Sequence, residues 1–208
     1  MSVQKQNVNS LNLKKDENIL VVKRDVLFGG DAWQGIERPQ DDRFVETIMA
    51  RKEFLPRSRM ELDFSYKQII PYLVFSHNDT YFLMQRKAKA SEQRLKSKYS
   101  LGIGGHIRQE DIQNADIASW ARREFHEEVD YAGNFEVTFL GILNDDSSDV
   151  GRVHIGFVYL LQGDSDQINV KEELQSGTLV SVEECKLFYD KMENWSKTVF
   201  DFLQKNRS

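Results

Sequence analysis

A glycine-rich stretch and a later run of glutamates constrain this chain more than any other feature. LGIGGHI spans 101–107, and REFHEEV spans 123–129. Glycines let the backbone come close to a bound ion or phosphate. Carboxylates crowded beside a core repel one another and resist desolvation, which a cation would relieve. The two stretches therefore indicate either a site for a metal ion and phosphate or, more simply, a tight turn followed by a solvated acidic helix end.

The glutamates fall in an expected helix over 114–129, where successive residues are rotated by about 100°. On this helix three carboxylates share one face: Glu124, Glu127 and Glu128. Apolar residues earlier in the helix project into the same arc: Ile117, Trp120 and Ala121. We therefore expect the acids to continue the inward face, with His126 on the other side. Such oxygen donors suit Mg²⁺ or Mn²⁺, whereas a surface pair between Arg123 and Glu127 is the simpler alternative.

The sequence around this helix predicts alternating strands and helices. β-Branched and aromatic residues predict strands over 19–28, 66–76, 80–87, 135–143 and 152–162. Helical spacing of apolar residues predicts helices over 41–55, 181–192 and 194–206. Pro56 should end the first of these helices, and Pro71 should weaken its strand or place it at a sheet edge. This order is typical of a layered α/β or α+β domain.

The composition argues against several classes of protein. The 208 residues carry a net charge of −5, whereas general binders of nucleic acid or membrane surfaces are usually basic. The single cysteine, Cys185, allows no internal disulfide, which favours a reducing cytoplasm. The polar first 18 residues lack the apolar core of a signal peptide, and no apolar run approaches the ~20 residues that cross a bilayer. We expect a cytoplasmic protein.

The stretch 105–131 resembles the signature of the Nudix hydrolases, called the Nudix box. That signature is a glycine, five residues, a glutamate, seven residues and then Arg-Glu-aliphatic-x-Glu-Glu-x-Gly-aliphatic. Gly105 matches the first glycine, and Asp111 stands at the first glutamate. REFHEEVDY supplies four further residues in register: Arg123, Glu124, Glu127 and Glu128.

Three features depart from that signature. Asp130 stands where the signature has its second glycine. Eleven residues separate Asp111 from Arg123, four more than in the family. The extra residues could lengthen the helix at its start by about one turn or form a bulged loop. Because aspartate replaces glutamate at position 111, Glu110 or Asp116 could serve there instead.

The resemblance implies a three-layer αβα sandwich with a mixed sheet, and hydrolysis of a nucleoside-diphosphate-linked or related pyrophosphate compound with Mg²⁺ or Mn²⁺. It implies three carboxylates and one backbone carbonyl as metal ligands: Glu124, Glu127, Glu128 and Gly105. Arg123 would orient a box glutamate, and Glu173, with Glu172 as its alternative, would act as general base. Substrate phosphates would contact three residues: Arg86, Gly104 and Gly105.

We expect a polar tail over 1–18, an N-terminal extension over 19–63 that packs on the rest, and a Nudix-like domain over 64–208. A silent module that binds a nucleotide and regulates a partner is the alternative, which the intact glutamates disfavour. An isopentenyl-diphosphate isomerase is less favoured still, because Cys185 lies in the wrong part of the chain. Neither a nucleic-acid polymer nor a membrane is expected as partner, and the extension is compatible with a homodimer. Four residues are expected to serve packing: Trp33, His154, Phe157 and Tyr159.

Overall fold

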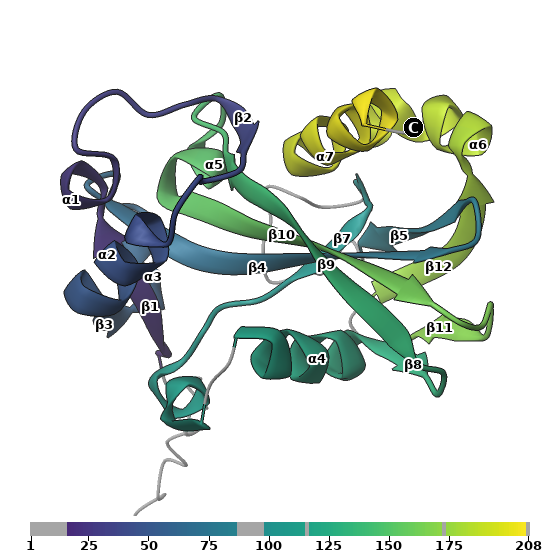
Figure 1. Cartoon of the computed structure of the whole chain (residues 1–208), viewed down its shortest axis with the longest axis horizontal. Coiled ribbons are helices and arrows are strands. Elements are labelled where there is room, and N and C mark those ends of the chain that lie inside the picture. The colour runs from purple at the N-terminus through teal and green to yellow at the C-terminus, as the bar shows by residue number, and fades with distance from the viewer. Residues whose placement is uncertain (1–15, 87–97, 115–116, 172–173, 207–208) are drawn as a thin grey trace, which may run out of the picture.

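A mixed β-sheet lies at the centre of the protein, with helices on both of its faces (Figure 1). The structure is a computed structural model that describes residues 16–86, 98–114, 117–171 and 174–206. Six strands cross the sheet in the order β12-β5-β4-β10-β9-β2. Their bounds are Gly35–Glu37 (β2), Tyr66–His77 (β4), Thr80–Arg86 (β5), Phe135–Asn144 (β9), His154–Gly163 (β10) and Leu174–Ser181 (β12).

The central pair, β4 and β10, is parallel, and the other neighbours along this order are antiparallel. Every residue of β4 between its two ends is buried. A strand covered on both faces needs such a continuous run of residues that tolerate burial. The hairpin expected around residues 77–79 is confirmed, because β4 and β5 join there.

The prediction that Pro71 weakens its strand or places it at a sheet edge was wrong, because Pro71 lies in this central strand. On the side of β4 away from β10, the described pairing with β1 (Asn18–Lys23) ends at Gln68, and pairing with β7 (Gly102–Gly104) begins at Tyr72. Pro71 falls in the break between these two ladders. A residue without an N–H is tolerated there because no ladder bond is required on that side.

The glycine-rich stretch fills a fork in the sheet. β4 and β5 pair only beside their turn, at Ser76 and His77, and then diverge. Into this gap come β6 (Tyr99–Ser100), which pairs with β5, and β7, which pairs with β4. A Cβ on Gly102 would overlap with the ring of Tyr72, so the close approach of β7 to β4 requires glycine there.

Helices form the two outer layers, which confirms the expected αβα arrangement. One face carries α4 (Ile117–Glu128), and the other carries α6 (Val182–Phe188) and α7 (Asn194–Lys205) (Figure 1). Ser181 and Glu184 form a capping box at the start of α6. Short 3-10 helices lie at Gln109–Asn114 (η2) and Tyr189–Lys191 (η3), and a two-stranded sheet joins β8 (Val129–Tyr131) to β11 (Ile168–Val170).

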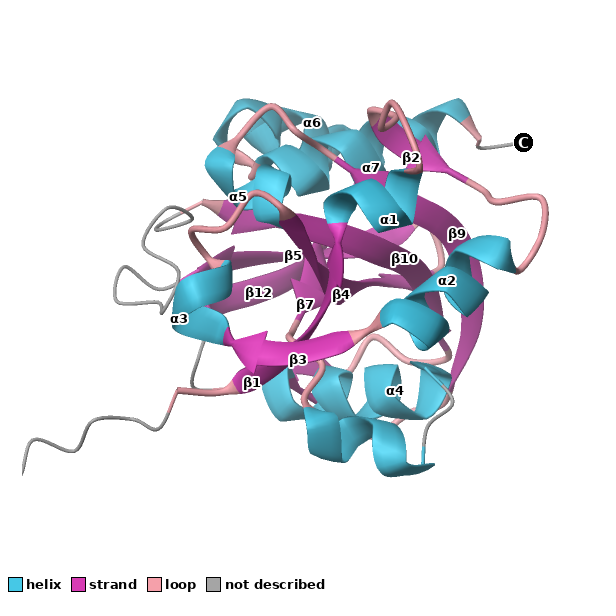
Figure 2. Ribbon diagram, turned by 90° about the vertical axis from the view of Figure 1, so that its left-hand side faces the viewer, coloured by secondary structure: helices cyan, strands magenta, loops and turns pink. Residues whose placement is uncertain are grey.

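The segment before β4 adds short elements along the sheet (Figure 2). They are β1, α1 (Arg24–Phe28), α2 (Arg43–Arg51), β3 (Glu53–Pro56) and α3 (Arg57–Met60), and α5 (Asp149–Val153) later precedes β10. Two predictions were wrong here. The strand expected over 19–28 turns into a helix at Arg24, and the helix expected over 41–55 ends at Arg51, because residues 53–56 pair with β1.

Two apolar clusters hold the layers together. One lies between the sheet and α4 and includes Phe75, Phe125 and Val129. The other lies between the sheet and the C-terminal helices and includes Val158, Cys185 and Val199. Within the described residues, no helix is both long enough and apolar enough to span a bilayer.

Candidate active site

The last turns of α4 present their acids beside the buried face of the helix. Phe125 and Val129 point into the core and are fully buried. Glu124 and Glu128 are half-buried at the border of that face, whereas the side chain of Glu127 is 51% exposed. The expectation that all three acids continue the inward face was therefore wrong for Glu127. His126 is exposed, as expected.

Gly105 provides the surface on which Glu124 rests. A Cβ at position 105 would overlap with Oε1 of Glu124, so any side chain there would displace the carboxylate. The glycine turn and the acidic helix, separate in sequence, are therefore in direct contact. Glycine at this position leaves room for the Glu124 carboxylate where it now lies.

The surroundings of Glu124 disfavour the charged form of its carboxyl group. Burial, and then the charges of Glu127 and Glu128, together raise the pKa of Glu124 to about 7 against the opposing effect of Arg123. Desolvation and like charges both favour the neutral acid. A shifted carboxyl beside two further acids is typical of functional sites and is rarer among structural charges.

Arg123 holds two of the box acids. Its guanidinium donates to Oε1 of Glu127 and, over 2.7 Å, to Oδ1 of Asp111. Asp111 is nearly buried, and its other oxygen accepts a 2.8 Å hydrogen bond from the backbone N–H of Arg108. Arg123 thus orients a box glutamate and fixes the turn that follows the glycine stretch. The role of Asp111, left open by the sequence, is to receive this arginine, while Glu110 is exposed.

The extra residues of the box do not simply lengthen α4. Asp111 lies within η2, which ends at Asn114, and α4 begins separately at Ile117. Residues 115–116, and with them Asp116, lie outside the described residues. The interruption therefore adds a 3-10 turn ahead of the helix, while Arg123 still reaches Asp111.

A small pocket joins the glycine strand to the acidic helix. Its lining residues come from β5, β6, β7, α4 and β12: Met84, Ser100, Gly102, Ile103, Gly104, Glu128 and Leu174. Glu128 is the acid among them, so one of the three carboxylates borders a space in the fork of the sheet. Gly104 lies on this wall, where the sequence placed a substrate contact.

The loop before β12 closes over the end of α4. The backbone N–H of Lys171 donates to the carbonyl of Glu128 over 2.9 Å, and its ammonium group donates to the carbonyl of His126. A cation here satisfies carbonyls that the helix end leaves open. The sequence analysis missed Lys171, although a lysine beside two acids in a strand connection was a signal. Glu173 lies outside the described residues, as do the side chain of Arg86 and residues 87–97.

Comparison with known proteins identifies the family. No protein-family model matches the chain. Protein YmaB of Bacillus subtilis (strain 168) is 38% identical over 210 residues, which cover 92% of this chain and 99% of YmaB. Tm1382, whose crystal structure is described as that of a candidate Nudix hydrolase, is 31% identical, with 91% of this chain and 99% of Tm1382 covered and a TM-score of 0.72. The chain belongs to the Nudix hydrolase family.

More distant Nudix structures share the fold of this Nudix hydrolase. The NUDIX domain of Shewanella oneidensis NrtR, solved with ADP-ribose, is 10% identical, with a TM-score of 0.54 and 67% of this chain and 87% of that chain covered. That likeness concerns the fold alone.

Cys185 is fully buried in the layer opposite α4, and Trp33 packs edge-on against Phe28 and Phe44, so both residues serve packing as expected.

The α4 acids of this Nudix hydrolase offer donor atoms of the kind that a divalent cation prefers. Three carboxylates lie within two turns of one helix, and the most buried of them, Glu124, is driven toward its neutral form by its surroundings. A cation at this place would reverse that preference by attracting the charged form. Carboxylate oxygens are the donors that Mg²⁺ and Mn²⁺ prefer, and Mg²⁺ also shares its shell with substrate phosphates.

Proposed function

We propose that this Nudix hydrolase is a divalent-cation-dependent enzyme that cleaves the phosphoanhydride bond of a nucleoside-diphosphate-linked or related pyrophosphate compound. The observation that carries the proposal is the contact of Glu124 with Gly105. It brings a carboxyl with a raised pKa, flanked by two further acids, against a glycine strand that borders a pocket. A solvated acidic helix end would need neither the buried carboxyl nor the glycine beneath it.

In the proposed site, Glu124, Glu127 and Glu128 hold Mg²⁺ or Mn²⁺, together with the carbonyl of Gly105. When bound, such an ion withdraws charge from phosphoryl oxygens and acidifies water. Arg123 keeps Glu127 and Asp111 in place through its two hydrogen bonds. The backbone of Gly104 and Gly105 forms the wall along which a pyrophosphate group lies, and Arg86 at the end of β5 neutralises a phosphate.

Glu173 is our candidate for the general base. Lys171 and Leu174, which stand on either side of residues 172–173 in the sequence, both lie beside Glu128: Lys171 through a backbone hydrogen bond, Leu174 through the shared pocket. These two contacts support the choice of a glutamate from this part of the chain. The neighbouring Glu172 offers a matched control, because the two residues differ only in their place along the same loop. Glu173→Gln should reduce kcat by about 10²-fold, as expected for loss of a base, and Glu172→Gln should change it little.

The experiment uses the full chain with Mg²⁺ or Mn²⁺ and a panel of pyrophosphate compounds that includes ADP-ribose, the ligand of the NrtR domain. We expect hydrolysis of at least one compound, with loss of cation-dependent activity in Glu127→Gln and Glu128→Gln. Glu136→Gln, which changes an exposed glutamate on β9, is the control. Unchanged turnover in both box variants would overturn the site. Tight nucleotide binding without turnover by the wild type would favour the silent module instead.

The substrate, the homodimer and the cytoplasmic location stay predictions. The panel addresses the first, and sedimentation velocity of the full chain addresses the second. Sedimentation as a single species with the mass of one chain would contradict the homodimer.

A further inference from the structure

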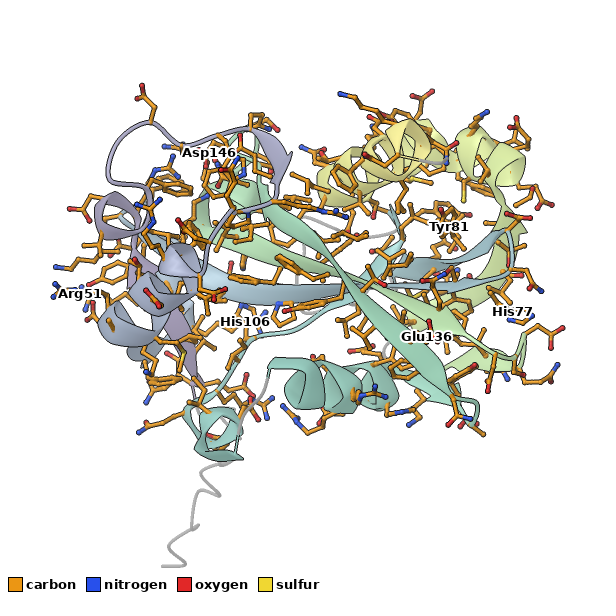
Figure 3. The ribbon with its side chains drawn as sticks, in the orientation of Figure 1. Arg51, His77, Tyr81, His106, Glu136 and Asp146 are labelled. Atoms are coloured by element: carbon orange, nitrogen blue, oxygen red, sulfur yellow. The ribbon has the colours of Figure 1, made fainter. Side chains whose placement is uncertain are left out.

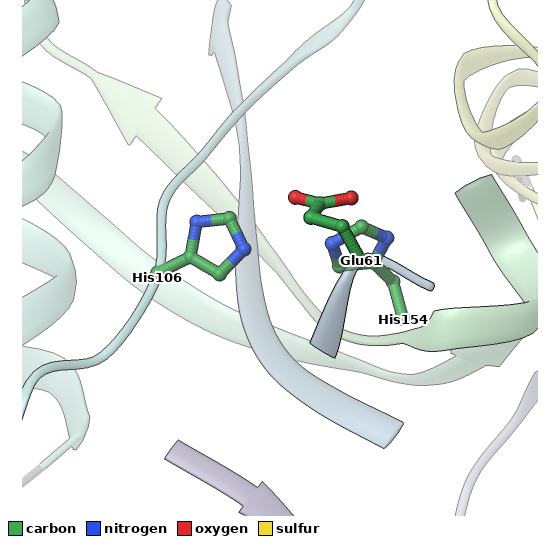
Figure 4. A group of neighbouring side chains, drawn as sticks. All are labelled: Glu61, His106 and His154. Carbon is green, nitrogen blue, oxygen red and sulfur yellow. The ribbon is translucent and has the colours of Figure 1, made fainter. Parts of the chain in front are cut away.

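A second group of metal-binding side chains lies away from the α4 acids. Glu61, His106 and His154 each bring a potential ligand atom within 4.8 Å of the other two. Figure 4 shows the three side chains converging from three separate segments of the chain. Glu61 follows α3, His106 follows the glycine stretch, and His154 opens β10.

This group lies on the face of the sheet opposite α4. Gly105 meets Glu124, and Ile107 packs in the cluster that contains Phe125, so His106 between them faces the other way. His154 confirms this placement, because its ring lies 6.3 Å from that of Trp195 in α7. Figure 3 shows His106 far from His77 and Glu136, toward the other end of the sheet. The group and the Nudix box therefore lie on opposite sides of one loop.

The ring of His154 is held by the backbone. Its Nδ1 lies 2.7 Å from the carbonyl oxygen of Val150, which can only accept a hydrogen bond. Nδ1 therefore carries the proton, and in the neutral ring Nε2 carries the lone pair. Metal-binding histidines commonly donate their second N–H to a backbone carbonyl in this way, which fixes both the tautomer and the ring orientation.

His106 is held by a buried amide. Its Nε2 lies 2.7 Å from Oε1 of Gln68, a fully buried side chain. The amide nitrogen of Gln68 donates to the carbonyl of Met60 over 3.2 Å, so the amide oxygen is the atom that faces His106. Gln68 is the neighbour of His154 in the β4–β10 ladder and therefore lies on the same face. A fourth potential ligand, the amide oxygen of Gln68, is thus buried at the edge of the group.

Glu61 is oriented by an arginine. Nε of Arg57 lies 3.4 Å from Oε1 of Glu61, and the glutamate side chain is only 18% exposed. Ligating carboxylates are usually held by such outer partners. Each of the three side chains is therefore held by a contact with its surroundings; at His106 this contact is made by Nε2 itself, so a bound ion would take the place of its hydrogen bond to Gln68.

We propose that Glu61, His106 and His154 form a binding site for a transition-metal ion of the Zn²⁺ class, separate from the Nudix box. Two imidazoles and one carboxylate are a donor set that Zn²⁺ accepts, whereas Mg²⁺ prefers oxygen alone. Tetrahedral Zn²⁺ with bonds of about 2.0–2.1 Å places its ligand atoms roughly 3.4 Å apart, so a small movement of the side chains closes the shell. Binding at Nε2 of His106 requires the ring tautomer that carries its proton on Nδ1, so the proton now on Nε2 moves to Nδ1, and the Gln68 oxygen is left available as a fourth ligand.

The ion would connect three parts of the fold. Glu61 belongs to the segment before β4, His154 to the central strand β10, and His106 to the loop that also supplies Gly105. Zn²⁺ would therefore clamp this loop from the face opposite Glu124. The inference is independent of the proposed hydrolysis, because it concerns zinc binding at other residues.

The test is zinc binding by the full metal-free chain, measured by equilibrium dialysis and elemental analysis in excess Mg²⁺, which competes for oxygen sites. We expect one zinc ion per chain to be retained. His106→Gln and His154→Asn keep an amide N–H for the contacts with Gln68 and Val150 but remove the ligand nitrogen, and each should weaken zinc binding by roughly 100-fold or more. His126→Gln, at the exposed histidine of α4, should bind zinc like the wild type.

Two further measurements keep the test decisive. Circular dichroism would show whether the histidine variants fold. Glu61→Gln changes a residue on the surface side of the group, so it tests the site even if they do not. This variant should weaken zinc binding. Co²⁺ in place of Zn²⁺ should give the visible absorption of a tetrahedral ion, and Glu61→Gln should lower it. The proposal is overturned if the wild type retains no zinc, if all three variants bind as the wild type does, or if Glu124→Gln removes the zinc, which would place the ion in the Nudix box.

Discussion

Two charged regions of this protein differ in the partners that their buried group receives. On α4, Glu124 is partly buried beside two other acids, and its pKa rises to about 7. At the N-terminal end of β4, Lys67 is fully buried, but each of its three N–H donors has an acceptor within 3.1 Å. These acceptors are a carboxylate oxygen of Asp146 and the carbonyls of Gly151 and His154.

The Lys67 region is organised as a structural joint. Asp146 also accepts two hydrogen bonds from Arg24, at 3.0 and 2.6 Å, so one carboxylate joins β4 to the end of β1. These partners hold the pKa of Asp146 at about 2, although its partial burial acts in the other direction. Asp146 lies in the loop beside α5, well away from α4 (Figure 3).

The difference separates structural charges from functional ones. Around Lys67, burial lowers the pKa of the ammonium group to about 8 despite Asp146, yet the group stays charged at neutral pH and each of its N–H donors has an acceptor. Around Glu124, burial and the two neighbouring acids raise the pKa by more than Arg123 lowers it. A bound cation would supply the positive charge that this carboxyl lacks. Changes to the first region should therefore act on stability, and changes to the second on activity.

The largest expected effect is on catalysis. Glu128→Gln should lower the cation-dependent kcat by about 10²–10³-fold, because it removes a charge that the ion and the phosphates need. Lys67→Met should leave kcat within a few-fold of the wild type when both are assayed below the melting temperature. Steady-state kinetics on the best substrate of the panel checks both. An equal loss of kcat in the two variants would contradict the assignment of activity to the α4 acids and of stability to the Lys67 region.

The second effect is on folding. Lys67→Met should reduce the free energy of unfolding by about 2–4 kcal/mol, because the carbonyls of Gly151 and His154 lose their buried donor. Lys205→Met, at an exposed position in α7, should stay within about 0.5 kcal/mol of the wild type. Urea denaturation at neutral pH measures both values. A Lys67→Met protein as stable as the control would contradict the structural role of this lysine.

The third effect depends on pH. Because the folded-state pKa of Glu124 is raised above its ordinary 4.5, ionisation of this group makes the metal-free protein less stable as pH rises from about 4.5 to about 7. Glu124→Gln should therefore stabilise the metal-free protein by roughly 2–3 kcal/mol at pH 8, with no gain near pH 4. Urea denaturation at the two pH values checks this, and a variant that is less stable at pH 8 would show that the glutamate is already compensated.

The smallest expected effect is also on stability, but here stability is lost as the pH falls. The pKa of Asp146 is lowered from 3.8 to about 2, so its contribution to stability is present above pH 4 and is lost as pH falls through about 2. Because this side chain is 30% exposed, the contribution should be only about 1 kcal/mol. Acid titration followed by circular dichroism should therefore show a weaker dependence for Asp146→Asn between pH 4 and pH 2 than for the wild type.

Local patterns predicted most of the fold. β4, β5, β9, β10, α6 and α7 lie close to their expected positions because their apolar spacing matches the burial they meet. The helix expected over 41–55 was too long, because the pairing of β3 with β1 competes with helix formation after Arg51. Pro71 was misplaced because its tolerance depends on a break between two partners that the sequence does not show.

The two proposed metal-binding groups differ in how much of each could be predicted from the sequence. The α4 acids lie within one helical segment, so their shared face followed from spacing alone. Glu61, His106 and His154 come from three distant segments, and His154 was expected to be an ordinary histidine of the sheet. Its alternation with apolar neighbours was interpreted correctly, but the partners across the sheet could not be known before the fold placed them.

The most direct test of the cation site is a titration of the Glu124 carboxyl by ¹³C NMR in the metal-free full chain, with Glu124→Gln used to assign the resonance. We expect a midpoint near pH 7 without added cation and a midpoint well below 4.5 in saturating Mg²⁺, because the ion favours the charged form. A midpoint near 4.5 that Mg²⁺ does not move would contradict the account, because Glu124 would then be an ordinary solvated acid.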